Sequence, residues 1–487
     1  MEIIKSTRGK DKLCYNGHMY VQKITKKNWI RWVCHKQRSN GCKGALTSSV
    51  TFEYPRSFVE HNHAADAVGI EVTKLRSTMK SRAKDINSRP NQVVAQCLQD
   101  ATDSVRARIG RLETCKRDLR RQKRGALPKE PDSLSELTIT EEWATTSGEH
   151  PRRFLLHDSG PDSHPRVIVF ATDEGLRTLA AAHTWHMDGT FSMCPRIFTQ
   201  LYSIRVPLGN TAVSCVYGFI QGKSQEAYET FLRAVLAGCE DLGFSPDPGN
   251  IVTDFEMATL QAISTVFGPD VHRQGCFYHL TQSTWRKIQD LGLVNLYRTN
   301  ADAKHFCGML DGLALLPLDK VSEGMSWLKE NTPPELVDLV SYFDSTYVSG
   351  TLRRIQPVAL DPDQPLPPLR FRRIPPLFPP EVWNVHTVTM EGRDRTNNIC
   401  EGWNFAFKQL VGHQHPALYT TIDALRKDSA ISLTTIVQYQ RGEPIHRPQK
   451  RAYRQHQNRL HTLCNRIAQE EVDVEEFLDC VGHSVRL

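Results

Sequence analysis

The sequence predicts an α/β protein, in which a helix-covered mixed sheet with a helical insertion follows a small β-rich domain and a basic helical segment. Three observations lead to this fold class. Short aromatic and β-branched stretches separated by turn residues fill residues 1–66. An apolar repeat of three and four residues runs through residues 91–121. From about residue 153, strand patterns are followed by alternating helix and strand patterns.

The composition is that of a folded protein with about two to four domains. Its 487 residues are 39% hydrophobic and 24% charged, with a mean hydropathy of −0.44, which excludes the profile of a disordered chain. There is no apolar window long enough for a membrane span and no secretory signal. We therefore expect an intracellular protein without membrane contact, whose 13 cysteines are reduced thiols or metal ligands rather than disulfides.

Charge is distributed unevenly along the chain. Residues 1–124 carry 27 Lys and Arg against 11 Asp and Glu, and residues 125–487 carry 34 against 43. The net charges are +16 and −9, which together give the +7 of the whole chain. This asymmetry favours a basic arm for a polyanion joined to a body with another task. A solvated, lysine-rich surface would give the same counts.

Four possible zinc ligands lie in the β-rich part: Cys34, Cys42, His61 and His63, in the pattern C-x7-C-x18-H-x-H. Strands are expected there at 13–15, 19–24, 29–33, 44–48 and 51–58. Two thiolates and two imidazoles suit tetrahedral zinc, and an H-x-H step in an extended segment places both imidazoles on one face. Unconnected Cys and His residues are the alternative. Cys14 is either a competing ligand or a packed small hydrophobe.

These residues resemble a known domain. Leu13, Tyr20, Trp32, Cys34 and the H-N-H at 61–63 together are similar to the FLYWCH-type zinc finger, over about the first 65 residues. The resemblance implies zinc-dependent binding of DNA or protein.

A single amphipathic helix is expected from about residue 91 to 121. Its apolar positions are Val94, Leu98, Ala101, Val105, Ile109, Leu112, Cys115 and Leu119. Its basic end consists of Lys116, Arg117, Arg120, Arg121, Lys123 and Arg124. This is more positive charge than the helix dipole requires. The cluster is either a grip for DNA phosphates or a nuclear-import signal, which would place the protein in the nucleus. Residues 125–134 read as a linker.

The acidic body has a recognisable order of elements. Strands are expected at 154–157, 166–171, 183–191, 198–208, 212–220, 250–254 and 271–277, with helices at 225–242, 256–267 and 280–290. From residue 183 the order is three strands, a helix, and then strand–helix–strand, which is the order of a ribonuclease-H-like mixed sheet.

Three acidic residues of the body are candidates for a catalytic metal site. Asp188 lies inside the first strand of this group and Asp254 ends the fourth, where buried carboxylates are costly unless they are paired or bound to a cation. Carboxylates on neighbouring strands can share two magnesium ions, which promote phosphodiester cleavage. Glu401, on a predicted helix, is the third candidate. The alternatives are turn or capping carboxylates, with Asp254 capping the next helix, and for Glu401 a solvated helix residue.

Four motifs in order resemble the Mutator-like (MULE) transposases, over about residues 150–415. They are D-G-T-F at 188–191, T-D-x-E at 253–256, C-x-x-H at 276–279 and N-N-x-x-E-x-W-N at 397–404. The resemblance implies a DDE-type recombinase with Asp188, Asp254 and Glu401 holding Mg²⁺ or Mn²⁺. It also implies double-stranded DNA as partner, at element ends and target, and a homo-oligomer on that DNA.

Cys276 and His279 have three possible roles: half of a zinc site, a Cys–His nucleophile pair, or support of a strand end. The family motif favours a functional His279, which would orient the scissile phosphate or a metal-bound water near Asp254.

The chain is expected to divide into six segments. They are a zinc finger (1–66), a basic helical segment and linker (67–150), the first part of the core (151–290), a helical insertion with an irregular Pro-rich loop and a basic patch at 370–373 (291–382), the acid-bearing helix (383–415), and a solvated helical and basic tail (416–487).

The function expected is metal-dependent DNA strand cleavage and transfer. The main alternative is a domesticated, non-catalytic DNA-binding regulator, and the third is a zinc-containing protein scaffold.

Overall fold

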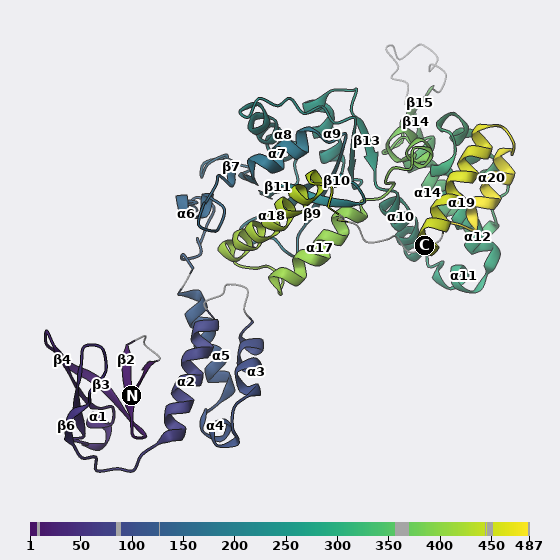
Figure 1. The fold of residues 1–487 in the computed structure, drawn as a ribbon. Helices are drawn as coiled ribbons and strands as arrows, with labels where there is room; N and C mark the ends of the chain where they lie inside the picture. Colours follow the sequence, from purple (N-terminus) through teal and green to yellow (C-terminus); the bar gives the residue numbers. More distant parts are fainter. Residues whose placement is uncertain are drawn as a thin grey trace, which may run out of the picture. The chain divides into compact units, whose positions relative to one another are not determined.

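The computed structural model describes residues 1–6, 10–83, 89–125, 127–355, 370–443, 445 and 451–485. The chain forms two compact units, Met1–Glu130 and Pro131–Leu487, whose elements are labelled in Figure 1. The boundary falls inside the linker expected at 125–134. Among the described helices, none has the length and apolar character needed to cross a membrane.

The N-terminal unit begins with a six-stranded antiparallel sheet whose strands follow chain order. They are β1 (Glu2–Lys5), β2 (Asp11–Tyr15), β3 (His18–Thr25), β4 (Trp29–Cys34), β5 (Ala45–Ser49) and β6 (Arg56–Val59), with the short helix α1 (Gln37–Asn40) after β4. Leu13, Tyr20 and Trp32 pack into a small core with Ile30 and Leu46.

Two details of this sheet differ from the prediction. β1 was not expected. The strand expected at 51–58 is mostly a turn, with positive φ at Phe52 and Tyr54. Of this segment, only the residues that belong to β6 pair with β5.

The described part of the N-terminal unit ends in four helices: α2 (Ala67–Arg82), α3 (Pro90–Gln99), α4 (Asp103–Arg108) and α5 (Leu112–Arg124). The single helix predicted over 91–121 is therefore wrong. The Thr102 side chain accepts a hydrogen bond from the N–H of Val105 and caps a new helix. Gly110, at φ +84°, separates α4 from α5. The apolar repeat continues across both breaks because the helices pack into one shared core.

The C-terminal unit is built on a seven-stranded mixed sheet with the order β13-β12-β9-β10-β11-β8-β7. The strands are β7 (Leu155–Asp158), β8 (Val167–Ala171), β9 (Thr184–Thr190), β10 (Gln200–Leu208), β11 (Thr211–Ile220), β12 (Asn250–Thr253) and β13 (His272–Gly275). β12 runs parallel to both β9 and β13, whereas the other neighbours are antiparallel. All seven strands lie where the sequence predicted them, within two residues at each end.

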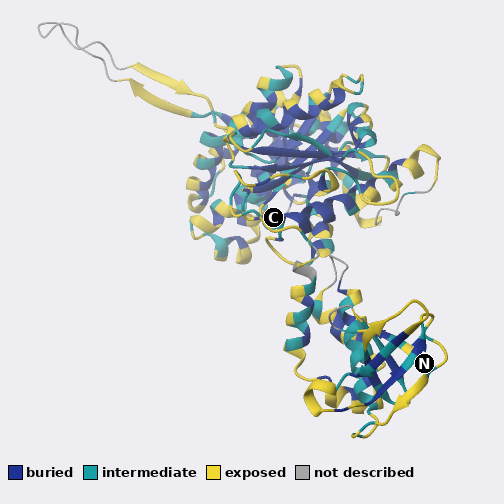
Figure 2. Cartoon of the chain, turned by 90° about the vertical axis from the view of Figure 1, so that its left-hand side faces the viewer, coloured by how far each residue is buried: buried dark blue, intermediate teal, exposed yellow. Residues whose placement is uncertain are grey.

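Helices cover both faces of this sheet, which is buried through the middle of the unit (Figure 2). On one face, Trp185 of β9 packs edge-on against Phe267 of α9 (Met257–Phe267), beside α8 (Gln225–Glu240). On the other face, Asp188 of β9 meets α17 (Asn398–Val411), and Tyr217 of β11 meets α18 (Leu418–Gln440). The short helices α6 (Glu141–Ala144) and α7 (Asp173–Ala180), which were not predicted, precede β7 and β9.

A helical insertion lies between α10 (Phe277–Asp290) and α17, as predicted. Its α-helices are α11 (Val294–Thr299), α12 (Ala301–Gly312), α13 (Val321–Glu330), α14 (Val337–Phe343), α15 (Pro380–Trp383) and α16 (His386–Met390). They share a large core with α19 (Arg451–Ala468) and α20 (Val474–Gly482). The tail predicted at 416–487 is helical in its described part, but the prediction that it is solvated is wrong, because Leu460, Phe477 and Val481 are buried in this core.

The Pro-rich stretch is not irregular throughout. β14 (Thr351–Ile355) and β15 (Arg370–Ile374) form a separate, exposed two-stranded antiparallel ribbon. The prediction fails for 370–374 because the prolines flank this segment and do not interrupt it. The connecting residues 356–369 lie outside the described part of the chain.

Asp311 of α12 predicts how stability depends on pH. It is fully buried, Thr284 Oγ1 donates to its Oδ1 at 2.6 Å, and burial raises its pKa to about 7. The folded chain thus holds the proton more tightly than the unfolded chain, so this stabilising term is complete below pH 4 and is lost as pH rises through 7. The free energy of unfolding of Asp311→Asn, measured in urea, should rise relative to that of the wild type by about 2–3 kcal/mol as the pH is raised from 5 to 8.

The matched control is Asp302→Asn, at an exposed position in the same helix. Its free energy of unfolding should differ from that of the wild type by nearly the same amount at every pH. Equal pH profiles for the Asp311 variant and the wild type would contradict the assignment.

Candidate metal and nucleic-acid sites

Cys34, Cys42, His61 and His63 converge in the N-terminal unit, as predicted. Their ligand atoms all lie within 4.8 Å of one another. Cys34 Sγ is 3.2 Å from His63 Nε2, and Cys42 Sγ is 3.3 Å from His61 Nδ1. These distances are close to the roughly 3.6 Å between sulfur and nitrogen in a tetrahedral zinc site. The four side chains therefore fit one zinc ion.

Neighbouring groups orient these ligands. His61 Nε2 hydrogen-bonds the Tyr20 hydroxyl at 2.9 Å, and His63 Nδ1 hydrogen-bonds the carbonyl of Ala64 at 2.9 Å. Each ring therefore directs its other nitrogen at the cluster, as metal-bound histidines usually do. Burial lowers the pKa of His61 to about 4, so the ring is neutral and keeps a lone pair for a metal.

The backbone around the two histidines differs from the prediction. The two histidines lie in a bend after β6, not in the extended segment that was predicted. Gly44 packs directly under His61, because a Cβ there would lie 2.4 Å from His61 Nδ1. Cys14 does not join the cluster but is buried with Ile4, Met19 and Ile70.

In the C-terminal unit, the three predicted acids lie on one face of the sheet. Asp188 is in β9, Asp254 directly follows the adjacent parallel strand β12, and Glu401 is in the first turn of α17. Among the described residues, the groups of metal-type side chains within a mutual 4.8 Å are the finger cluster and His305–Asp479–His483. The three carboxylates are thus spaced more widely than the ligands of a single ion.

The charges of the three acids are nevertheless coupled at Asp188. Burial raises the pKa of Asp188 to about 7, with further contributions from the charges of Asp254 and Glu401. The pKa of Asp254 is also raised, mainly by burial. Carboxylates that resist ionisation in the absence of a cation are suited to bind a divalent ion, which would offset their repulsion.

Asn397 and Asn404 fix α17 against the strands. The buried Asn397 donates through Nδ2 to the carbonyl of Met187 at 2.9 Å, and through its backbone N–H to Cys276 Sγ at 3.1 Å. Asn404 Nδ2 donates to Asp188 Oδ2 at 2.7 Å. The sequence motif contained both asparagines, but spacing alone did not reveal their roles.

His279 and Cys276 have separate roles. His279 Nε2 is 4.0 Å from Glu401 Oε1, so it lies beside Glu401, and burial lowers its pKa, which favours a neutral ring. Burial raises the pKa of the Cys276 thiol to about 11, which argues against a Cys–His nucleophile pair. Cys276 instead joins the end of β13 to the start of α17.

The sequence did not reveal two polar residues near Asp254, Lys223 and Tyr228. Lys223 lowers the pKa of Asp254 and lies 3.3 Å from Glu256 Oε2, and the Tyr228 hydroxyl donates to Glu256 Oε1 at 3.0 Å. Glu256 was visible in the T-D-x-E motif, but Lys223 and Tyr228 come from another part of the sequence.

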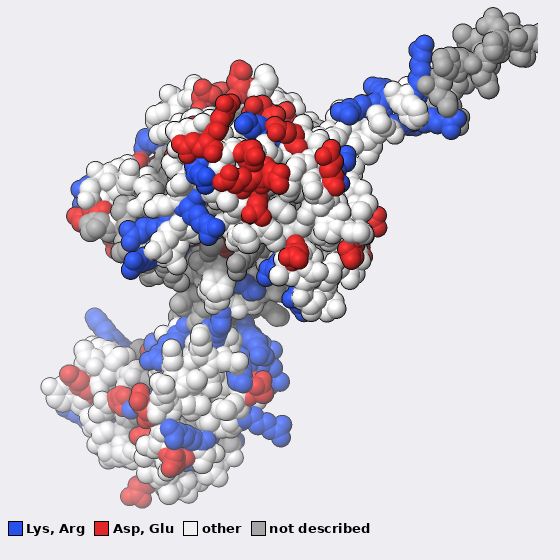
Figure 3. Space-filling view, turned by 90° about the vertical axis from the view of Figure 1, so that its right-hand side faces the viewer, with Lys and Arg blue, Asp and Glu red and all other residues white. Residues whose placement is uncertain are grey.

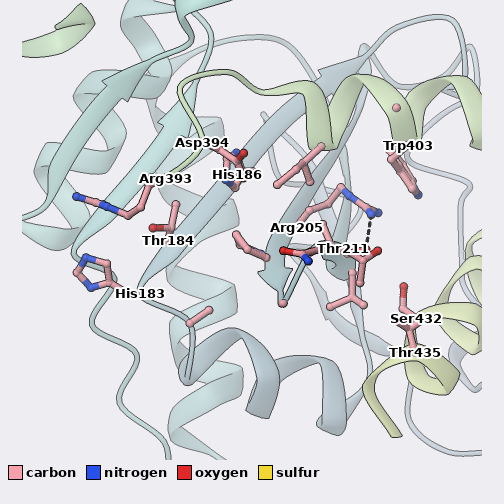
Figure 4. A pocket seen from close by; sticks show the side chains of 18 of the residues that line it. His183, Thr184, His186, Arg205, Thr211, Arg393, Asp394, Trp403, Ser432 and Thr435 are labelled. Atoms are coloured by element: carbon pink, nitrogen blue, oxygen red, sulfur yellow. Dashed lines mark hydrogen bonds between the residues drawn. The ribbon is translucent and has the colours of Figure 1, made fainter. Parts of the chain in front are cut away.

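A cavity of about 930 Å³ lies on the same sheet face, between the strands, α17 and α18 (Figure 4). His186, Arg205, Trp403 and Ser432 are among its lining residues. None of the three acids lines it, so the cavity is distinct from the acidic cluster.

The predicted basic cluster lies in α5. Arg117, Arg120 and Arg121 are exposed, whereas Lys116 is paired with Glu113 at 2.7 Å. The side chains of Lys123 and Arg124 lie outside the described part of the structure. Three cations of the cluster are thus available to a polyanion.

A small antiparallel domain with a Cys₂His₂ cluster, joined to an acid-bearing α/β unit, defines the class of this protein. Residues 3–63 match the FLYWCH zinc finger domain, and residues 184–283 match the MULE transposase domain. The combination predicted from the sequence is therefore confirmed. The MULE match includes Asp188 and Asp254 and ends before Glu401. No curated protein matches the chain.

The finger predicts a specific loss of zinc. Cys42→Ala should lower the zinc content by one equivalent per chain and unfold residues 1–66, because structural zinc supplies about 10–16 kcal/mol to such folds. Zinc is measured by atomic absorption and folding by hydrogen exchange of the full chain.

Cys14→Ala is the matched control, since it removes a buried thiol from the same domain without touching the cluster. It should retain the zinc. Full zinc content in the Cys42 variant would refute the site.

Proposed function

We propose that this protein is a DNA-binding, DDE-type transposase or transposase-derived enzyme that cuts and joins DNA strands. The observation that carries the proposal is the placement of Asp188, Asp254 and Glu401 on one sheet face, with the pKa of Asp188 raised by burial and by the other two charges. The strand order β11-β10-β9-β12-β13, in which β11, β10 and β9 pair antiparallel and β9, β12 and β13 pair parallel, supports a ribonuclease-H-like core.

The three carboxylates would hold Mg²⁺ or Mn²⁺. Bound there, the metal ions would activate a water or a DNA hydroxyl and stabilise the leaving oxygen. Two ions about 3.5–4 Å apart need ligands spread more widely than those of one ion, which agrees with the spacing of these acids. Asp188 would be one of the metal-holding carboxylates, and the charges of Asp254 and Glu401 both contribute to its raised pKa.

Other residues of this chain would prepare the site. Asn404 orients Asp188 through its hydrogen bond. His279, held neutral beside Glu401, would accept or hand over a proton near that carboxylate. Lys223 lies close enough to Asp254 to lower its pKa and would attract phosphate.

The finger and the exposed arginines of α5 support binding of duplex DNA, at element ends and target. We further propose that the chain acts in the nucleus as a homo-oligomer on DNA. The alternative function is a domesticated regulator that binds DNA without cutting it; the same finger and basic helix favour it.

The test is magnesium-dependent cleavage of a plasmid that carries the sequences flanking the coding locus. Asp188→Asn and Glu401→Gln should each lose roughly 100-fold or more of the activity, as expected when charge stabilisation in the transition state is removed. Their DNA affinity should persist, because neither variant removes a cation.

Glu240→Gln, which changes an exposed acid of α8, is the control and should cleave normally. Unchanged cleavage by the Asp188 variant would disprove the triad. A wild type that binds duplex DNA with a steep salt dependence and never cleaves it would establish the regulator.

A further inference from the structure

The ribbon β14–β15 is a charged element without a structural partner. Its two strands contain five arginines and no acid: Arg353, Arg354, Arg370, Arg372 and Arg373. Every residue of both strands is exposed, and Figure 3 shows the cationic side chains gathered along it. No ion pair joins these arginines to an acid among the described residues. The ribbon therefore presents unneutralised positive charge to solvent.

The register of the ribbon concentrates that charge. Arg353 lies directly opposite Arg372, and Ile355 opposite Arg370 on the same face. Like charges directly opposite one another destabilise a strand pair, and an isolated two-stranded hairpin is already marginal in water. Leu352 and Phe371 are 67% and 62% exposed, so burial of apolar surface does not compensate. A polyanion would supply the missing stabilisation.

The base of the ribbon is connected to the acidic cluster. Both strands emerge at one point, because a Cβ on Gly350 would lie 2.0 Å from the carbonyl oxygen of Ile374. Near this point, the ring of Phe378 lies 5.1 Å from that of Phe255, the residue after Asp254. Tyr347, just before β14, also packs on Phe255, with ring centroids 6.0 Å apart. The residues that flank the ribbon thus pack on the neighbour of the proposed catalytic aspartate.

We propose that β14–β15 is a DNA-docking arm that binds duplex DNA through arginine–phosphate contacts. The inference rests on the proposed function, which makes duplex DNA the polyanion that this unit handles. The major groove admits a two-stranded ribbon, and a duplex carries one phosphate charge per about 1.7 Å of its axis. Arginine is suited to phosphate because its planar guanidinium forms paired hydrogen bonds.

The test is equilibrium binding of the full chain to a fluorescent duplex at several salt concentrations, without added divalent metal. Each lost phosphate contact lowers the slope of log affinity against log salt by about 0.9. Arg353→Gln with Arg372→Gln should therefore lower the slope by about 2 and weaken binding about 10- to 100-fold at 0.1 M salt. Arg298→Gln with Lys304→Gln, at exposed positions of α11 and α12, is the matched control and should change neither.

A second variant guards against local misfolding. Replacement of residues 352–373 by two glycines removes the whole ribbon, and the adjacent ends of its strands allow the chain to close. This variant should keep the thermal transition of the wild type and bind DNA at least as weakly as the double variant. Wild-type affinity and slope in both ribbon variants would overturn the proposal.

Photocrosslinking separates DNA from an acidic protein as the ligand. A benzoyl-phenylalanine at Phe371 should crosslink to the duplex, and the same group at Val337, which is 50% exposed on α14, should not. Crosslinks to protein only would overturn the proposal. Because binding is measured without metal-dependent cleavage, failure of the arm and failure of the triad are distinguishable.

Discussion

The acidic cluster depends on the fixation of Asn397. This residue lies 143 positions beyond Asp254 in the sequence, yet it is fully buried against β9 and the end of β13. Its side chain donates to the carbonyl of Met187 in β9, and its backbone N–H donates to the buried thiol of Cys276 at the end of β13. The start of α17 is therefore held to two strands that lie on either side of β12, which leads to Asp254. Without this anchor, the first turn of α17, which carries Glu401, would lose its hydrogen bonds to β9 and to the end of β13, and only contacts further along the helix, such as that of Asn404 with Asp188, would hold α17 on the sheet. A buried polar group of this kind tolerates few replacements, because its partners would be left without hydrogen bonds.

The insertion is compatible with this anchor because it has its own hydrophobic core. The helices α11 to α16 bury their apolar faces against α19 and α20 rather than against the sheet. The insertion can therefore lie between α10 and α17 without displacing residues of the sheet's core. The part of the sheet face that α17 does not cover is covered by α18, whose Asp428 accepts hydrogen bonds from Tyr217 and Trp403. The aromatic residue after Asp254 packs into the core of the insertion, since Phe255 contacts Phe378 and Tyr347.

The sequence predicted the sheet well and the helical packing poorly, for physical reasons. Strand alternation and turn residues are local signals, and the buried strands of the C-terminal unit are nearly continuous apolar runs. The helix break at Gly110 could not be predicted from the apolar repeat, because the short helices on both sides of it pack into one core and continue the same spacing of apolar residues. The tail at 416–487 was predicted to be helical but solvated, because its basic residues do not indicate that Phe477 and Val481 are buried. The zinc ligands and the acids could be found from their residue types, whereas Asn397, Lys223 and Tyr228 act through contacts that only the folded chain defines.

The net negative charge of the C-terminal unit would repel DNA. Residues 125–487 carry a net charge of −9, and a cluster of carboxylates is the last surface that a DNA phosphate would approach in the absence of metal. Under the proposed function, divalent ions at the acids would remove the local repulsion of phosphate, but the unit would remain acidic and would not attract DNA over a long range. Long-range attraction of DNA therefore requires exposed positive charge on elements that are distant from the acids. There the attraction is weakened by salt but not by the nearby carboxylates. Under the proposed function the arginine ribbon would meet this requirement in the C-terminal unit, and the packing of the flanking Phe378 and Tyr347 on Phe255 would relate the position of DNA on the ribbon to the strand end that bears Asp254.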